Sequence, residues 1–278
     1  MILKGNLIKC SRHFLQIRTM SRTLSGKIEG ALIDLSGTVH VEDKIVGNSV
    51  TAIEKLRAAN IKIRFVTNTT KESVSTLYNR LVKLGVKLEK DEIWSSLTAA
   101  SKYIKDKNLN PFYIASEDAL SQLPPVDESK PLNAVVVGLA PDKFCFEYFN
   151  KALDVLRKGG VLIAIHAGRF YKTSSGYAVG PGFVAKGLEY STGVSPIVIG
   201  KPDPLFFQSG IPEGLEPAKC VMIGDDPVDD IEGAQKLGMQ TILVTKTGKF
   251  AGYEIPPEVD SVMVDDIEAA VELILNAK

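Results

Sequence analysis

The sequence has few cysteines and no net charge, and both features exclude classes of protein. Three cysteines among 278 residues, with no CxxC pair, do not build a disulfide framework or a zinc cluster, and they fit a reducing compartment. Lys and Arg together number 33, as do Asp and Glu, so no net field attracts the chain to nucleic acid. No apolar run approaches the roughly 20 residues of a membrane-spanning helix, so no membrane partner is expected.

Two glycine-rich phosphate-binding patterns are also missing. Neither G-x-G-x-x-G nor G-x-x-x-x-G-K-[ST] occurs, which disfavours a nucleotide-binding module. A hydrophobic content of 45% and a charged content of 24% are typical of globular proteins with ample material for a core. The length allows one large domain or two ordinary ones.

The N-terminal segment 1–27 has no acidic residue. Its basic residues are Lys4, Lys9, Arg12, Arg18, Arg22 and Lys27. Basic, acid-free segments that contain Ser and Thr are typical of mitochondrial transit peptides; a disordered extension, or an upstream start with Met20 as the usual initiator, is the alternative. We expect a cytoplasmic protein, with mitochondrial targeting through this extension as the alternative.

From Gly30 onward, apolar runs of strand length alternate with amphipathic helical patterns. Strands are predicted at 31–35 and 61–66, and helices at 49–59, 70–84 and 95–107. This order implies right-handed crossovers and a parallel sheet.

The middle of the chain has a second alternation of its own. Its predicted elements are strands at 111–115, 134–139 and 161–165, a helix at 146–158, and a polar, glycine-rich run at 166–182. The first pattern resumes with strands at 196–199, 220–223 and 241–244 and ends in a helix at 266–275. We therefore predict an α/β fold with a Rossmann-like parallel-sheet core, residues 28–105 and 195–278, and an inserted α/β domain, residues 106–194.

Asp34 is the candidate nucleophile. It follows the apolar run 31–33 and precedes Ser36 and Gly37, at the carboxyl end of a predicted strand, where open α/β sheets build their sites. A carboxylate is ionised at neutral pH and can attack phosphorus to give an aspartyl-phosphate. Because two anions then approach each other, a cation such as Mg²⁺ is required. An aspartate that only starts a turn is the alternative.

Thr67, Asn68 and Lys201 also follow apolar runs. The hydroxyl and the amide emerge beside Asp34 if their strands are neighbours, and both can bind a phosphate without adding charge. An ammonium just ahead of a helix, as at Lys201, can stabilise a phosphoryl group and the aspartate together. The alternative for the threonines that follow, Thr69 and Thr70, is that they start a helix. The alternative for Lys201 is that it is a solvated lysine in a loop.

The strongest acidic cluster comes after the apolar run 220–223. Asp225 is the candidate metal ligand. Ligands for hard cations are often carboxylates that follow a buried strand and a glycine, as they do here. Asp230 is expected to act on the metal indirectly or through water. Asp226 and Asp229 are expected to be solvated or to cap the next helix. An acidic loop that serves solubility alone is disfavoured by the buried strand before it.

In this order, the motifs resemble those of the haloacid dehalogenase-like phosphohydrolases. They read Asp34-x-Ser36-Gly37-Thr38, Thr67-Asn68, Lys201-Pro202 and Gly224-Asp225-Asp226-x-x-x-Asp230, and the match covers residue 30 to about 250. The inserted domain resembles the large α/β cap of the subfamily that contains nucleotide, pyridoxal-phosphate and glycolate phosphatases. The resemblance implies Mg²⁺ held by Asp34, the backbone carbonyl of Ser36 and Asp225. It also implies phosphate held by Thr67, Asn68 and Lys201, and a homodimer formed through the cap.

Ser36 departs from the family pattern. Most phosphatases of the family have Asp at this position, which protonates the leaving group and then activates water. An alcohol is a poor acid and base at neutral pH, and losing such a group costs about 10²–10⁴ in rate. We hypothesise a preference for activated phosphoryl donors, namely phosphoramidates, acyl phosphates, aryl phosphates or pyrophosphate. His40 as a replacement acid is the alternative, and a plain loop histidine is in turn the alternative to that.

The sequence thus predicts a Mg²⁺-dependent phosphatase that acts through an aspartyl-phosphate on a small phosphorylated, phosphoamide or pyrophosphate substrate. A catalytically weak homologue that binds Mg²⁺ and phosphate and acts through a protein partner is the alternative, supported by Ser36 alone. The cap is expected to close over the site and set specificity, with His166 to Lys172 as its contact segment. A charged hairpin that points into solvent is the alternative for that segment.

Overall fold

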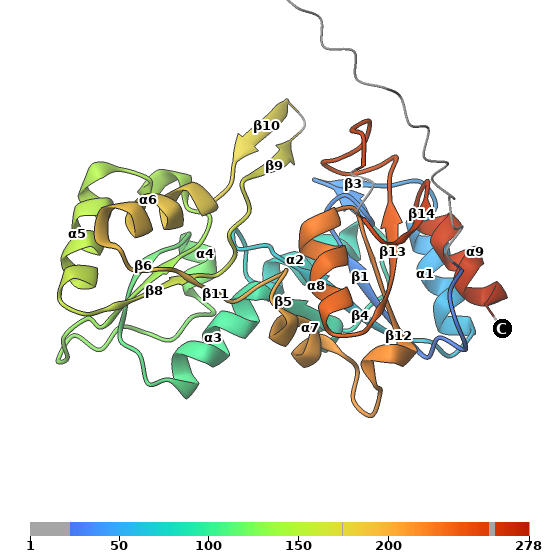
Figure 1. Cartoon of the computed structure of the whole chain (residues 1–278), viewed down its shortest axis with the longest axis horizontal. Coiled ribbons are helices and arrows are strands. Elements are labelled where there is room, and N and C mark those ends of the chain that lie inside the picture. Colours follow the sequence, from blue (N-terminus) through green and yellow to red (C-terminus); the bar gives the residue numbers. More distant parts are fainter. Residues whose placement is uncertain (1–22, 174, 256–258, 278) are drawn as a thin grey trace, which may run out of the picture.

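The computed structural model describes residues 23–173, 175–255 and 259–277, and only the backbone of Lys172. The chain forms two lobes, each built on its own parallel sheet (Figure 1). Most of the basic N-terminal segment lies outside the described residues, so mitochondrial targeting stays a prediction. Within the described ranges, no helix has the length and apolar character needed to cross a membrane.

The core lobe is built on a six-stranded sheet in which every neighbouring pair is parallel. In sheet order the strands are β14 (Val262–Val264), β13 (Gln240–Val244), β12 (Cys220–Gly224), β1 (Gly30–Asp34), β4 (Lys62–Thr67) and β5 (Ile93–Ser95). The central strands β12 and β1 are buried along their whole length, which explains their continuous apolar runs. The carboxyl ends of β12, β1 and β4 therefore lie side by side, as the predicted site requires.

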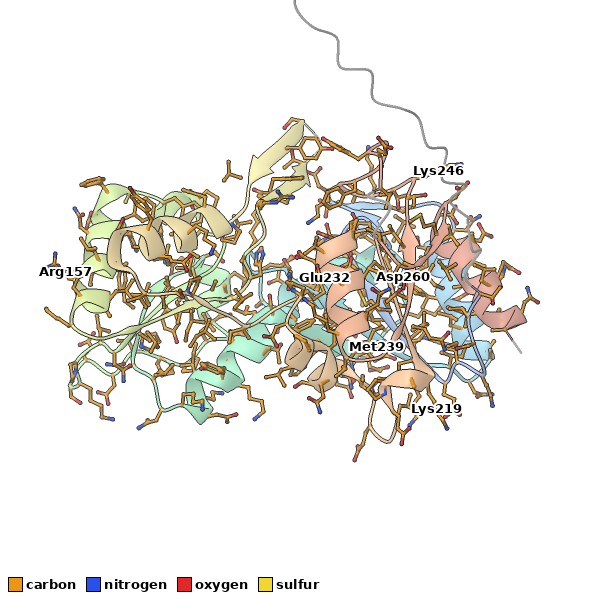
Figure 2. All side chains as sticks on the ribbon, viewed as in Figure 1. Arg157, Lys219, Glu232, Met239, Lys246 and Asp260 are labelled. Atoms are coloured by element: carbon orange, nitrogen blue, oxygen red, sulfur yellow. The ribbon has the colours of Figure 1, made fainter. Side chains whose placement is uncertain are left out.

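Helices cover both faces of this sheet, and side chains fill the space between the layers (Figure 2). Successive residues of β1 point to opposite faces. Ala31 and Ile33 belong to the cluster formed with α1 (Ser49–Ala58), α2 (Val74–Lys83) and α9 (Ile267–Asn276). Leu32 belongs instead to the cluster formed with α7 (Pro204–Gly210) and α8 (Gly233–Lys236).

The second lobe, the predicted cap, has a four-stranded parallel sheet. Its strands in sheet order are β11 (Ile197–Val198), β8 (Val161–Ala164), β7 (Ala134–Val137) and β6 (Pro111–Ile114). One face packs with α3 (Ser96–Asp106) and α4 (Glu117–Leu120), and the other with α5 (Phe146–Arg157) and α6 (Gly182–Thr192). The predicted fold class, a parallel-sheet α/β core accompanied by a second α/β unit, is confirmed.

Two segments expected in the core pack with the cap sheet instead. β11 pairs with β8, with Ile197 opposite Ile163, so the expectation that the core sheet resumes at 196–199 is wrong. Leu97 and Ile104 of α3 also pack with cap side chains. An apolar run indicates burial but not which sheet buries it. The discontinuous two-domain division stays a proposal, with these segments moved to the cap.

Short elements complete the described chain. They are the hairpins β2 (His40–Val41) to β3 (Lys44–Ile45) and β9 (Phe170–Thr173) to β10 (Gly176–Val179), the 3₁₀ turns Lys90–Glu92, Pro141–Lys143 and Pro217–Lys219, and the π-helical turn Pro227–Glu232. The β9–β10 hairpin stands between the two lobes (Figure 1). The helix predicted from Thr70 begins at Val74, because Ser73 caps it by accepting a hydrogen bond from the Thr76 amide at 3.2 Å.

Phe207 tests the packing of α7, the helix that follows the site lysine. Its ring is 0% exposed, so Phe207→Ala should lower the free energy of unfolding by about 3–5 kcal/mol through lost burial and the cavity left behind. Leu205, on the same helix but 68% exposed, gives the matched control, and Leu205→Ala should change stability by less than about 0.5 kcal/mol. Urea denaturation measures both values, and equal losses would contradict the packing described here.

Candidate active site

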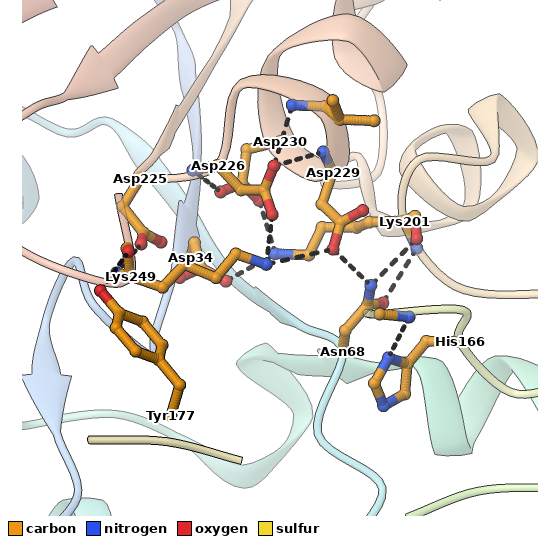
Figure 3. Close-up of polar contacts among 12 residues, drawn as sticks. Asp34, Asn68, His166, Tyr177, Lys201, Asp225, Asp226, Asp229, Asp230 and Lys249 are labelled. Atoms are coloured by element: carbon orange, nitrogen blue, oxygen red, sulfur yellow. Dashed lines mark hydrogen bonds and ion pairs between the residues drawn. The ribbon is translucent and has the colours of Figure 1, made fainter. Parts of the chain in front are cut away.

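The candidate site lies at the carboxyl ends of β1, β4 and β12, in a cavity of about 740 Å³. Both lobes line it: Asp34 and Lys201 come from the core side, and His166, Phe170 and Tyr171 from the cap. Figure 3 shows the polar groups converging on the space between these elements. This is the place where open parallel sheets bind ligands, because the strand ends bring loops together there.

Lys201 joins two of the carboxylates. Its Nζ lies 2.5 Å from Asp34 Oδ1 and 2.6 Å from Asp230 Oδ1 (Figure 3). Burial of Lys201 disfavours its charged form, but the adjacent carboxylates outweigh burial and raise its pKa. The ammonium therefore stays charged and fixes the positions of both acids.

Asp34, Asp225 and Asp230 form a buried acidic cluster. Each offers a carboxylate oxygen, and these oxygens lie within 4.8 Å of one another. Asp34 Oδ2 is buried and has no hydrogen-bond partner in the described part of the chain. Burial, followed by the charges of Asp34 and Asp230, raises the pKa of Asp225 well above its usual range. One ammonium does not balance three carboxylates, and an all-oxygen set of this kind suits a hard divalent cation.

Asp230 differs from the other two acids because both of its oxygens are engaged. Oδ1 contacts Lys201, and Oδ2 accepts a hydrogen bond from the Asp226 amide at 3.0 Å. Burial raises its pKa to about 7. The Asp230 carboxylate can occupy this place only because residue 224 is glycine, since a Cβ at position 224 would overlap it. These contacts hold Lys201 and the loop after β12 in place, and the expected indirect part of Asp230 in metal binding stays a prediction.

Asp226 and Asp229 were expected to be solvated or to act as caps. Asp226 does cap, since its Oδ1 accepts hydrogen bonds from the Val228 and Asp229 amides at 2.9 and 3.0 Å. Solvation is wrong for Asp226, which is buried and forms an ion pair with Lys249. Asp229 is half-buried with its Oδ2 3.5 Å from Asn68 Nδ2, and burial raises its pKa to about 6.

Asn68 has a positioning role that its place in the sequence did not indicate. Its Nδ2 donates to the Lys201 carbonyl at 2.9 Å, and its Oδ1 accepts from the Lys201 amide at 2.9 Å. The end of β4 is thereby tied to the loop that carries the lysine, across 133 residues of sequence. Thr67 lies beside it, 4% exposed, and its Oγ1 accepts from the Thr69 amide at 3.2 Å.

His40 is a poor candidate for the missing acid. Its side chain is 3% exposed, and its Nδ1 donates to the Glu42 carbonyl at 2.9 Å. Burial and the charge of Arg80 lower its pKa, so the imidazole is neutral at neutral pH. Ser36 is exposed and lines the cavity.

The contact segment of the cap does not simply point into solvent. Phe170 lies 6.0 Å from Phe250 of the core, measured between ring centroids, and Tyr177 Oη donates to the Lys249 carbonyl at 3.1 Å. His166, Phe170 and Tyr171 of the expected segment line the cavity. The side chain of Lys172 lies outside the described atoms.

Lys249 is a site residue that sequence reasoning missed. Its amide donates to Asp225 Oδ2 at 2.9 Å, and its ammonium pairs with Asp226 and lies 3.9 Å from Asp229 Oδ2. Lys249 lies in the loop that follows the apolar strand β13. A polar group after an apolar strand was also the signal that pointed to Asp34, so the sequence did contain a sign of this residue.

Comparison with known proteins identifies the family of the chain. A family model described as haloacid dehalogenase-like hydrolase matches residues 31–126, and a related model matches residues 198–271. Haloacid dehalogenase-like hydrolase domain-containing protein 2 of Bos taurus is 46% identical over 224 residues, which are 80% of this chain and 86% of that protein. The chain belongs to the haloacid dehalogenase-like hydrolases. The family resemblance stated from the sequence is confirmed.

Phosphatases are among the relatives of this hydrolase. Phospholysine phosphohistidine inorganic pyrophosphate phosphatase of Homo sapiens is 35% identical over 258 residues, 90% of this chain and 95% of that protein. The solved p-nitrophenyl phosphatase from Archaeoglobus fulgidus aligns with a TM-score of 0.78 at 24% identity, over 89% of this chain and 99% of that one. The structural likeness shows the shared fold.

Gly224 tests the close approach of the acidic loop to β12. In Gly224→Ala the new methyl group would push the Asp230 carboxylate away from Lys201, and we expect a loss of about 1–3 kcal/mol in the free energy of unfolding. Gly187, on the exposed side of α6 with open space around it, gives the control. Gly187→Ala should stabilise the protein by about 0.5–1 kcal/mol. Thermal and urea unfolding compare the two, and a neutral Gly224→Ala would contradict the geometry.

Proposed function

We propose that this hydrolase is a Mg²⁺-dependent phosphatase that takes the phosphoryl group of a small substrate onto Asp34 and then passes it to water. The proposal rests on the surroundings of the two oxygens of the Asp34 carboxylate. One oxygen lies 2.5 Å from Lys201, and the other is buried without a partner among the described residues. The phosphatase names of relatives support the reaction class.

Asp34, the backbone carbonyl of Ser36 and Asp225 would hold the Mg²⁺. The fit rests on the unpartnered Asp34 Oδ2, on the closeness of the carboxylate oxygens, and on a donor set made of oxygen alone. When bound, the ion offsets the charge of the carboxylates and of the phosphoryl oxygens, so that two anions can meet. Thr67, Asn68 and Lys201 would hold the phosphate.

The proposed chemistry has two steps. In the first, an Asp34 oxygen forms a bond to phosphorus as the bond from phosphorus to the leaving group breaks, and the leaving group departs with the electron pair. Lys201 compensates the negative charge shared by Asp34 and the phosphoryl group. In the second, water attacks the aspartyl-phosphate, releasing inorganic phosphate and the Asp34 carboxylate.

The leaving group determines which substrates suit this site. Ser36 is a poor proton donor, and the lowered pKa of His40 keeps that ring neutral at neutral pH, with its one proton on the Nδ1 that donates to the Glu42 carbonyl. Substrates whose leaving groups need little proton assistance are therefore favoured: phosphoramidates, acyl phosphates, aryl phosphates and pyrophosphate. The name of the human relative, which includes phospholysine, phosphohistidine and pyrophosphate, supports this class.

A substrate panel tests the preference. With Mg²⁺ present, kcat/KM for p-nitrophenyl phosphate and imidodiphosphate should exceed that for an alkyl phosphate such as glycerol phosphate by about 10²-fold or more. Ser36→Asp should reduce this ratio by raising the alkyl phosphate rate. His40→Asn, which keeps a donor for the Glu42 carbonyl, should leave the ratio unchanged. Equal values of kcat/KM in the native chain would rule the preference out.

Pre-steady-state kinetics tests the covalent step. Since Ser36 activates water poorly, the aspartyl-phosphate should accumulate, and p-nitrophenyl phosphate should give a burst of about one p-nitrophenolate per chain before slower turnover. Asp34→Asn should abolish the burst, EDTA should suppress it, and added Mg²⁺ should restore it. A native chain that binds phosphate but gives neither burst nor turnover would instead support the alternative of a catalytically weak homologue that acts through a partner.

A further inference from the structure

The core loop that follows β13 contacts the candidate metal ligand Asp225 through its backbone. The Lys249 amide donates a hydrogen bond to Asp225 Oδ2 at 2.9 Å (Figure 3). The residue before it, Gly248, has a φ of 77°, and a Cβ there would overlap the Asp225 carboxylate. The loop therefore lies directly against this buried acid, and its position determines where the carboxylate oxygens point.

The cap holds the other side of the same residue. Tyr177 of the β9–β10 hairpin donates from its hydroxyl to the Lys249 carbonyl at 3.1 Å. The amide and the carbonyl of Lys249 belong to two successive planar peptide groups, so the two hydrogen bonds fix the backbone on both sides of its Cα. Two hydrogen bonds thus lead from the cap, through one core residue, to a carboxylate of the acidic cluster.

Aromatic contacts also hold the hairpin against this loop. The Phe170 ring lies 5.5 Å from that of Tyr177 and 6.0 Å from that of Phe250, measured between centroids. The Lys249 ammonium lies 6.0 and 5.4 Å from the centroids of Phe170 and Phe250. A hydrogen bond to Tyr177 raises the pKa of Tyr253, which belongs to the same core loop. The hairpin is therefore docked on the loop by several contacts, not by one hydroxyl alone.

The side chain of Lys249 connects the docked loop to the rest of the acidic cluster. Its ammonium pairs with Asp226 and lies 3.9 Å from Asp229 Oδ2. Through its backbone and its side chain, this one residue contacts both Asp225 and the acids that follow it. A displacement of Lys249 would therefore change the surroundings of Asp225 as a whole.

We propose that Tyr177 is a positioning residue for the Mg²⁺ site, because it holds Lys249 and, through Lys249, Asp225. The proposal rests on the function proposed above, since it needs Mg²⁺ to bind at Asp225. Coupling between two sites is reciprocal, so docking of the hairpin strengthens Mg²⁺ binding by the same factor by which Mg²⁺ strengthens docking. The site reaches its full affinity for Mg²⁺ only when the cap hairpin lies on the core loop.

Mg²⁺ binding measured by calorimetry without substrate tests this coupling. Tyr177→Phe removes the hydroxyl but keeps the ring, and it should raise the Mg²⁺ dissociation constant about three- to tenfold, as expected for the loss of one hydrogen bond. Tyr190→Phe makes the same chemical change at a cap residue that is 94% exposed, and it should have no effect. Asp225→Asn should abolish the heat of this site and so identifies it.

The Mg²⁺ dependence of the burst distinguishes positioning from a general structural role. In Tyr177→Phe, the Mg²⁺ concentration that gives half of the maximal burst rate should rise by the same factor as the dissociation constant. The burst rate at saturating Mg²⁺ should stay within about twofold of the native rate, since the bound metal restores the position of Asp225. A merely structural defect would lower the rate at saturating Mg²⁺ as well.

Hydrogen exchange on the native chain does not depend on how well a variant folds. Mg²⁺ should slow the exchange of amides in the loop 246–253, and it should also slow exchange in β9 and β10, which contribute no ligand to the proposed metal site. In Tyr177→Phe the effect of Mg²⁺ on the two hairpin strands should be smaller, because the hydrogen bond that couples them to Lys249 is gone.

The outcomes separate this inference from the proposed function. If the native chain binds Mg²⁺ at Asp225, but Tyr177→Phe binds it equally tightly and Mg²⁺ leaves exchange in the hairpin unchanged, the role of Tyr177 is wrong while the phosphatase proposal stands. A native chain that binds no Mg²⁺ and shows no burst overturns both. A raised dissociation constant in Tyr177→Phe but not in Tyr190→Phe, together with protection of the native hairpin by Mg²⁺, supports the inference.

Discussion

The structure around the site depends on one buried interaction, the Lys201 ammonium between the carboxylates of Asp34 and Asp230. Nζ lies 2.5 and 2.6 Å from the two acids, and all three side chains are almost completely buried. Taking these charges out of water is expensive, and only close pairing offsets that cost. The pairing fixes the ends of β1 and the loops after β11 and β12 relative to one another. Asp225, which Lys201 does not compensate, leaves an excess of negative charge that a divalent cation would offset.

The site belongs to neither lobe alone. Asn68 ties the end of β4 to the backbone of Lys201 with two hydrogen bonds. Thr70 accepts a hydrogen bond from the Leu139 amide of the cap at 2.9 Å. Phe170 of the cap also makes an aromatic contact with Phe250 of the core. Since Lys249 in that same core loop holds Asp225 through its amide, the arrangement of the cap and the geometry of the acidic cluster are connected.

Ser36 and His40 bear on the release of the leaving group and not on the transfer of the phosphoryl group to Asp34, so the two parts of the proposed reaction depend on different residues. The groups that the proposed function needs to accept a phosphoryl group, Asp34, Lys201 and the acidic cluster, lie together at the strand ends. The group needed to move a proton to an alkoxide is missing, and the buried, neutral His40 does not replace it. This is the reason for proposing that the site prefers phosphoryl donors whose leaving groups need little proton assistance.

The sequence by itself determined the parallel α/β plan, the presence of an inserted unit, and the polar residues at the strand ends. These are local signals, because burial of a strand requires an apolar run and a site at its end requires a polar break. Only the tertiary structure decided that β11 and α3 pack with the cap, that Asn68 holds Lys201, and that Lys249 contacts the acidic cluster. Those facts depend on contacts between residues far apart in the chain, and no local pattern of hydrophobicity records which partner a buried or polar group will meet.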